Sequence, residues 1–268
     1  MKSESFEIAA LEDEFQDALS RWHAEQGYQL DFMALAQARG IEVIESETAP
    51  SLYIHAKRRI VLNSGEGVRR QRHTRMHELS HHLLYELDEG AFVQRVERLA
   101  HARARAAKDL MEQLCKRGGR ELAVPRPFVN DVFLRCPDDA ERAMKLAIRC
   151  KVSLALAGQR IADLERSRAV WGVVLSKSGI VVDCFGNDVK NAKYKTGVGH
   201  QLPYIHALRQ PFTHMRLEFF RAPIPFKFSK KQMPRHMQAM ADELRGQTIV
   251  FFNSRAAVGR AMTPLFEL

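Results

Sequence analysis

The chain has 268 residues, of which 46% are hydrophobic and 27% charged, with a formal net charge of +9 and a pI near 9.6. These values exclude a mainly disordered or fibrous chain, and the length favours two folded units or one domain with a substantial appendage. The basic balance favours an acidic partner such as nucleic acid, an anionic surface or an acidic protein, although many basic proteins bind none of these.

Neither secretion nor membrane insertion is indicated. The N-terminus MKSESFEIAALEDEF is acidic and amphipathic and lacks the basic and apolar regions of a signal peptide. No window approaches about eighteen uninterrupted apolar residues. The four cysteines contain no CxxC pair, which indicates reduced thiols in a chain of this length. We therefore expect a cytoplasmic protein without membrane contacts.

The chain begins with two predicted helices. Apolar residues recur at helical spacing through the first segment, at Phe6, Leu11, Phe15, Leu19 and Trp22. A second short helix is predicted from Asp31 as its N-cap to Gly40 as its terminator. These apolar stripes indicate core packing and not binding sites.

A small sheet and a histidine-rich helix follow. The runs IEVIES, LYIHA and RIVLNS are rich in β-formers and predict a small antiparallel sheet. After the break NSGEG, helical patterning resumes near Arg69 and continues to Leu87, and a longer helix rich in Ala and Arg is predicted from Ala91 to about Arg117. The prolines of VPRPF end this block.

The remainder divides into a helical and a strand-rich part. A helical region is predicted from about Val129 to Arg166. Two β-rich runs then flank a Ser-Gly turn in AVWGVVLSKSGIVVDCFG, and RLEFF, FKFS and TIVFFN add strand candidates around one helix near Lys231 to Arg245. The last hundred residues therefore predict a separate α/β domain.

The stretch HTRMHELSHH places four histidines within ten positions, and two of them form the pattern HExxH. On a helix, His77 and His81 project from one face and can bind a single metal ion through their imidazoles. Glu78 lies beside them, where its carboxylate can take a proton from a water at the site, as a general base must. The alternative is a histidine-rich solvated helix, but Leu79, Leu83 and Leu84 give this helix an apolar side that favours burial.

A catalytic metal site needs a third protein ligand and one open position. His82 and Glu86 lie on the same helix but are turned away from the His77/His81 face. Local spacing leaves four acidic candidates open: Asp88, Glu89, Glu97 and Glu112.

The runs NSGEGVRRQRHTRMHELSHHLL and MEQLCKRGGRELAVP resemble the ImmA/IrrE metallopeptidases. In that family an HExxH helix follows a small sheet, and the third ligand is a glutamate thirteen residues before a proline. Aligning Pro125 with that proline makes Glu112 the third ligand. Arg75, Arg120, Ala123 and Val124 depart from the family pattern in ways that affect packing and groove shape but not the ligands.

The resemblance implies an α+β fold in three parts. These are a zincin-like metallopeptidase domain over residues 1–126, a helix-turn-helix-like helical segment over 127–168 and a GAF-like sensor or regulatory domain over 169–268. An ordinary helical bundle is an equal alternative for the middle segment. Similarity in the last part is faint, and only architecture is inferred there.

The same resemblance implies a zinc-dependent metalloendopeptidase, with Mn²⁺ as a possible substitute. Its expected substrate is a helix-turn-helix transcriptional repressor, whose cleavage would derepress stress-response genes of the DNA-damage type or mobile-element genes. Direct nucleic-acid binding is possible but not required, and the oligomeric state is open. The alternative function is a DNA-binding or ligand-sensing transcriptional regulator with a structural or degenerate metal site, which the net charge and the helix-turn-helix-like run would favour.

Overall fold

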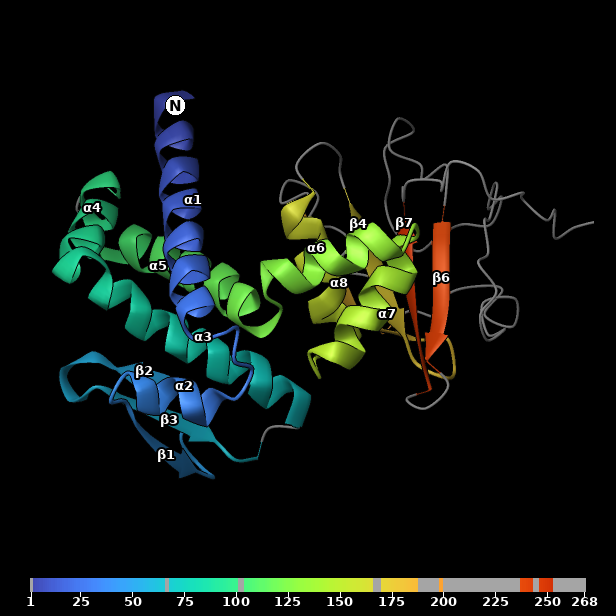
Figure 1. Ribbon diagram of the computed structural model, residues 1–268, viewed down its shortest axis with the longest axis horizontal. Helices are drawn as coiled ribbons and strands as arrows, with labels where there is room; N and C mark the ends of the chain where they lie inside the picture. The colour runs from blue at the N-terminus through green and yellow to red at the C-terminus, as the bar shows by residue number, and fades with distance from the viewer. Residues whose placement is uncertain are drawn as a thin grey trace, which may run out of the picture. The chain divides into compact units, whose positions relative to one another are not determined.

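The computed structural model describes residues 2–65, 68–100, 104–165, 170–187, 198–199, 237–242 and 246–252 (Figure 1). The chain divides into two compact units, Met1–Pro127 and Phe128–Leu268. Both combine helices with a small sheet, so the α+β class is confirmed. No helix within the described residues has the length and apolar character needed to cross a bilayer. The three-domain division stays a prediction.

The first unit contains a three-stranded sheet and most of the long helices. In chain order its elements are α1 (Lys2–Glu25), α2 (Phe32–Ala38), β1 (Glu42–Ser46), β2 (Leu52–Ile54), η1 (His55–Lys57), β3 (Arg59–Asn63), α3 (Val68–Glu86), η2 (Leu87–Gly90), α4 (Ala91–Leu99) and α5 (Ala104–Ala123). Helix α3 packs against β2 and β3 on one side and against α5 on the other, and α1 packs on α5 (Figure 1).

The two N-terminal helices form as predicted. Leu11, Phe15, Leu19 and Trp22 are buried, whereas Phe6 is 76% exposed at the N-terminal end of α1. The Asp31 carboxylate accepts hydrogen bonds from the backbone N–H groups of the second and third residues of α2, so it is the expected N-cap.

The prediction of an antiparallel sheet is wrong for one pair of strands. Strand β3 lies in the centre, antiparallel to β2 but parallel to β1. Parallel neighbours need a connection of about a dozen residues or more, and residues 47–58, which contain β2 itself, supply it. Runs of β-forming residues predict strands but carry no information on their direction.

The single long helix expected from Ala91 to Arg117 is two helices. Helix α4 ends at Leu99, with Ala100 as its C-cap, and α5 begins at Ala104. No glycine or proline marks this break in the sequence. Phe92, Val93 and Val96 of α4 are buried, while α5 takes a separate course along α3.

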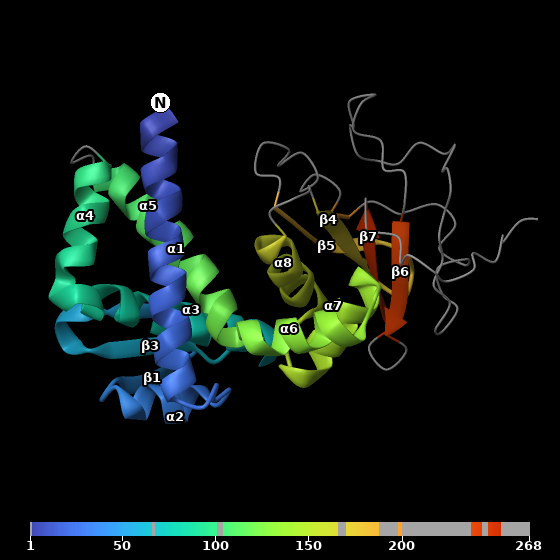
Figure 2. The same cartoon turned by 45° about the horizontal axis from the view of Figure 1, so that its top comes forward.

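The second unit is a sheet covered by helices. Its elements are α6 (Arg126–Arg135), which begins at the end of the first unit, α7 (Asp139–Arg149), α8 (Leu154–Leu164), β4 (Trp171–Leu175), β5 (Val181–Gly186), β6 (Met237–Asp242) and β7 (Gln247–Phe252). The sheet has the order β5-β4-β7-β6 and all its pairings are antiparallel. Helices α7 and α8 pack against each other, α7 on β6 and β7, α8 on β4 and β5 (Figure 2).

Helix α8 is mostly buried against this sheet. Eight of its eleven residues are buried. The Gln159 side chain donates to the Gly186 carbonyl and accepts from the Gly186 N–H, both at 3.0 Å. A Cβ on Gly158 would lie 2.7 Å from the Phe185 ring, so helix and strand are in close contact.

The C-terminal predictions are confirmed in part. The strands of AVWGVVLSKSGIVVDCFG and TIVFFN form β4, β5 and β7, whereas RLEFF and FKFS lie outside the described residues. The helix expected from Lys231 to Arg245 is wrong over Met237–Asp242, which form β6. Met, Gln and Ala favour helices, but pairing with β7 provides the backbone hydrogen bonds and buries Ala239.

Candidate metal centre

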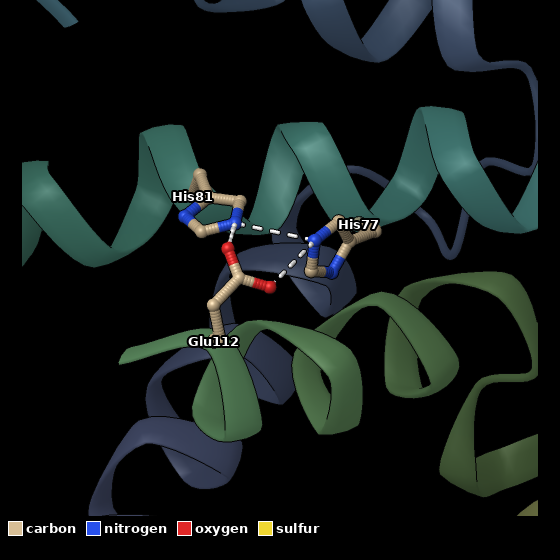
Figure 3. Close-up of side chains that lie close together, drawn as sticks. All are labelled: His77, His81 and Glu112. Carbon is tan, nitrogen blue, oxygen red and sulfur yellow. Dashed lines mark hydrogen bonds and ion pairs between the residues drawn. The ribbon is translucent and has the colours of Figure 1, made fainter. Parts of the chain in front are cut away.

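Two helices of the first unit bring three metal-ligating side chains together (Figure 3). His77 and His81 extend from one face of α3, and Glu112 faces them from α5. The Nε2 atoms of the two histidines are 3.2 Å apart. The Glu112 carboxylate oxygens lie 3.6 Å from His77 Nε2 and 3.3 Å from His81 Nε2.

These separations fit one metal ion. Four ligands at the usual zinc distances in a tetrahedron are roughly 3.3 Å from one another. The three observed separations, 3.2, 3.3 and 3.6 Å, lie close to that value. Among the described residues this trio is the one group of His, Cys, Asp and Glu side chains whose ligand atoms converge within 4.8 Å. Two imidazoles and a carboxylate suit zinc and also accept manganese.

Burial keeps both imidazoles in the neutral form that binds metal. The pKa of His81 is lowered to about 4, chiefly by desolvation and then by the neighbouring His77, while the Glu112 charge opposes both effects. Desolvation also lowers the pKa of His77 against the raising effect of the Glu112 charge. Neutral imidazoles at pH 7 need not lose a proton before they bind a cation.

Glu78 lies at the edge of the trio. It is 5% exposed, and its Oε1 atom is 3.9 Å from His77 Nε2. A carboxylate here is beside the ligand atoms without being one of the converging three. This is the place from which a general base can take a proton from a water in the site.

A pair of glycines on α5 allows the two helices to approach. A Cβ on Gly119 would lie 2.8 Å from His77 Cα, and one on Gly118 would lie 2.2 Å from Ser80 Oγ. Both contacts are shorter than real Cβ contacts, so only glycine permits this helix separation. A Gly-Gly pair inside a helix is itself a signal of close packing, but the sequence does not show which helix packs there.

The other acidic candidates are elsewhere. Asp88 and Glu89 belong to η2, and Glu97 belongs to α4; none of them is in the converging group. His82 and Glu86 are turned away from it, as expected. However, His82 is not an incidental surface residue, because it is fully buried and lies 2.8 Å from the Tyr53 hydroxyl.

Comparisons with known proteins find one matching family model and a solved structure of similar fold. Residues 36–162 match the Peptidase_M78 family, described as the IrrE N-terminal-like domain. No curated protein matches the chain. A solved structure of a Mycobacterium tuberculosis transcriptional regulator is similar in fold, with a TM-score of 0.52 at 15% identity, over 89% of this chain and 75% of that chain.

The family match spans β1 to β3, the HExxH helix and the segment that contains Glu112. The family is one of metallopeptidase-type hydrolases, and the matched residues include both helices of the metal centre. The match of residues 36–162 to the IrrE N-terminal-like domain therefore fits the expected ImmA/IrrE family.

Proposed function

We propose that the protein is a cytoplasmic, metal-dependent endopeptidase that cleaves a helix-turn-helix transcriptional repressor at a specific site and so derepresses stress-response or mobile-element genes. The observation that carries the proposal is the convergence of His77, His81 and Glu112 with Glu78 beside them. A structural metal site needs no adjacent glutamate, whereas peptide hydrolysis needs a base at this place.

Each side chain has a defined task in this proposal. His77, His81 and Glu112 hold the ion, with zinc favoured and manganese acceptable. When bound, the ion lowers the pKa of water and polarises the substrate carbonyl. Glu78 takes a proton as the water oxygen adds to the carbonyl carbon, and passes it to the amide nitrogen as the C–N bond breaks.

An extended substrate segment is proposed to add to the sheet at β2. In the order β1-β3-β2 this strand is at an edge, and among the described residues it pairs only with β3. Helix α3 packs against β2 and β3, so this edge is the one beside the metal-bearing helix. Main-chain hydrogen bonds along such an edge align a peptide with little dependence on its sequence.

The second unit is proposed to be regulatory, with α7 and α8 as the helix-turn-helix-like segment and the four-stranded sheet as part of a GAF-like domain. Since most of α8 is buried, we do not assign it to DNA reading. The regulator alternative is supported by the net charge of +9 and by the likeness in fold to a protein named a transcriptional regulator. Binding of the purified protein to promoter DNA without any repressor cleavage would favour it.

The test is incubation of the purified full-length protein with Zn²⁺ or Mn²⁺ and candidate repressors from its own genome, followed by mass analysis of fragments. Wild type should cleave one candidate at one position, and Glu78→Ala should abolish cleavage while retaining the metal. Glu97→Ala, an exposed glutamate of α4, is the matched control. Absence of cleavage with every metal and candidate would overturn the peptidase assignment, and cleavage by Glu78→Ala would overturn the role of Glu78.

A further inference from the structure

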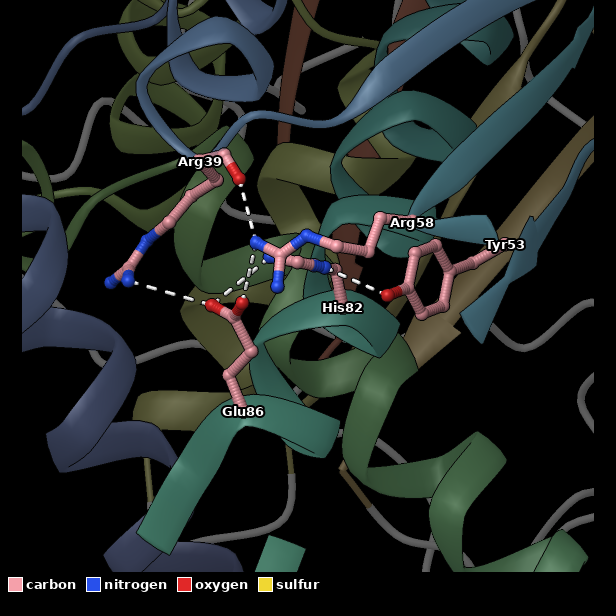
Figure 4. A network of polar contacts seen from close by, with 5 residues as sticks. All are labelled: Arg39, Tyr53, Arg58, His82 and Glu86. Carbon is pink, nitrogen blue, oxygen red and sulfur yellow. Dashed lines mark hydrogen bonds and ion pairs between the residues drawn. The ribbon is translucent and has the colours of Figure 1, made fainter. Parts of the chain in front are cut away.

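A second polar cluster lies on the face of α3 that is turned away from the metal ligands (Figure 4). His82 is 0% exposed and directly follows the ligand His81. Its Nδ1 atom is 2.8 Å from the hydroxyl of Tyr53, the central residue of β2. The two rings meet edge to face, with centroids 5.3 Å apart. One hydrogen bond therefore joins the edge strand to the metal-bearing helix.

The other side of the His82 ring contacts a carboxylate held by two arginines. His82 Nε2 is 3.0 Å from Glu86 Oε2, one helical turn further along α3. Glu86 also pairs with Arg58 at 2.8 Å and with Arg39 at 3.5 Å. A carboxylate only accepts hydrogen bonds, so the neutral tautomer that suits both contacts has its proton on Nε2, on the side of Glu86, and accepts from the Tyr53 hydroxyl at Nδ1.

The arginines extend the cluster to the remaining elements around the sheet. Arg58 lies between η1 and β3 with φ 46°, a left-handed conformation, and its guanidinium also donates to the Arg39 carbonyl at 2.8 Å. Arg39 is the C-cap residue of α2. The chain of contacts thus joins β2, the start of β3, the end of α2 and the C-terminal half of α3.

Directional contacts of this kind restrict movements that apolar packing tolerates. An apolar interface between a helix and an edge strand allows small sliding displacements, because its contacts have no preferred direction. Hydrogen bonds weaken steeply when their angle or length departs from the optimum. A polar cluster that joins several elements around a buried histidine therefore favours one arrangement of those elements.

We propose that Tyr53, His82 and Glu86 are positioning residues that fix strand β2 along α3, so that a peptide added to β2 presents its scissile carbonyl at the His77/His81/Glu112 site. This inference rests on the proposed peptidase function and on substrate addition at β2. It assigns the positioning to side chains that touch neither the ion nor the peptide. A displacement of about 1 Å between a bound peptide and its reacting groups is enough to lower catalysis strongly.

The test compares two metal-directed ligands on the full-length zinc-loaded protein. Acetohydroxamate engages the ion alone, whereas a blocked tripeptide hydroxamate engages the ion and lies along the edge strand. The ratio of their dissociation constants measures how well β2 aligns a peptide with the ion. The variants are Tyr53→Phe, which removes only the hydroxyl, and Glu86→Gln. Tyr85→Phe is the matched control, since Tyr85 belongs to the same aromatic cluster, with its ring centroid 6.3 Å from that of Tyr53, and has no hydrogen bond to His82 among those described.

In wild type and Tyr85→Phe the tripeptide hydroxamate should bind more tightly than acetohydroxamate. In Tyr53→Phe this advantage should fall by about fivefold to tenfold, the value of one well-formed hydrogen bond, with zinc affinity and acetohydroxamate binding unchanged. Glu86→Gln should reduce the advantage too. In free energy, the double variant should lose less of the advantage than the two single variants lose together, because both residues act through His82.

Three results would overturn the inference. If Tyr53→Phe lowers the thermal midpoint but leaves the advantage intact, the cluster only stabilises the fold. If Tyr53→Phe loses zinc or acetohydroxamate affinity, the cluster acts on the ion site and not on β2. If wild type shows no advantage for the tripeptide, substrate addition at β2 is wrong. If the wild-type protein shows the advantage for the tripeptide but cleaves no repressor, the proposed function is wrong and the inference about β2 is not.

Discussion

At the residue scale, the metal centre depends on a few side chains whose spacing follows from helix geometry. His77 and His81 are four residues apart and meet on one face of α3 at 3.2 Å between their Nε2 atoms. Glu112 comes from a separate helix, and its two oxygens each approach one histidine. The anionic ligand is therefore the residue that local spacing on α3 cannot supply.

Glu112→Gln should weaken zinc binding by more than about tenfold, because an amide oxygen replaces the anionic ligand at nearly the same size. Competition with a chromophoric chelator measures this affinity. Gln113→Ala, at the exposed neighbouring position on α5, should leave it unchanged. Equal affinities of Glu112→Gln and wild type would exclude Glu112 as a ligand.

Metal-free protein should lose stability as the pH falls from 6.5 toward 4. The pKa values of His81 and His82 are both lowered to about 4, chiefly by desolvation, whereas the unfolded chain takes up these protons near pH 6.5. Within this window the unfolded state binds more protons, so the free energy of unfolding decreases with falling pH.

Urea titrations with chelator at pH 7.5 and pH 5 test this dependence. The urea midpoint should be lower at pH 5 than at pH 7.5. His82→Gln should show a smaller difference between the two midpoints, because it removes one of the imidazoles that take up a proton on unfolding. A variant with the full wild-type difference would show that His82 does not contribute.

At the element scale, the separation of α3 and α5 decides whether the three ligands converge. Gly118 and Gly119 remove the two Cβ atoms that would collide with Ser80 and with the His77 backbone. Cys115 and Leu114 on the same helix are fully buried. Helix α5 was predicted as part of one longer helix, which places Glu112 in a helix but does not show which neighbour it faces.

Gly119→Ala should weaken zinc binding and lower the thermal midpoint. In an open helix this substitution stabilises by about 1 kcal/mol. Here a Cβ would lie 2.8 Å from His77 Cα, so the helices must separate and the sign should reverse. Metal affinity and calorimetry of this variant measure both effects. A midpoint above that of wild type would show that the contact relaxes at no cost.

At the scale of the whole molecule, the chain divides into two compact units. The first contains the complete ligand set, and the second contains a sheet with α7 and α8 packed on it. The sequence of α7 and α8 fits either a helix pair that reads DNA or a helix pair that covers a sheet. In the structure most of α8 is buried. Its hydrogen bonds to β5 show that α8 covers the sheet.

Gln159→Ala should lower the thermal midpoint of the protein without changing any affinity for duplex DNA. The variant loses two hydrogen bonds to the Gly186 backbone, each contributing about 1 kcal/mol. Calorimetry and electrophoretic mobility shifts at several salt concentrations measure the two properties. Reduced DNA affinity with an unchanged midpoint would restore α8 as a DNA-reading helix.

The sequence by itself determined the features that local periodicity encodes. These are the two N-terminal helices, the HExxH helix with His77, Glu78 and His81, and the strands β4, β5 and β7. The identity of Glu112 followed only from family resemblance, since residue spacing left four acidic candidates. Only the tertiary structure decided the parallel pairing of β1, the break between α4 and α5, the strand at β6 and the buried Tyr53–His82 contact. Each of these depends on contacts between elements, and local residue preferences do not specify such contacts.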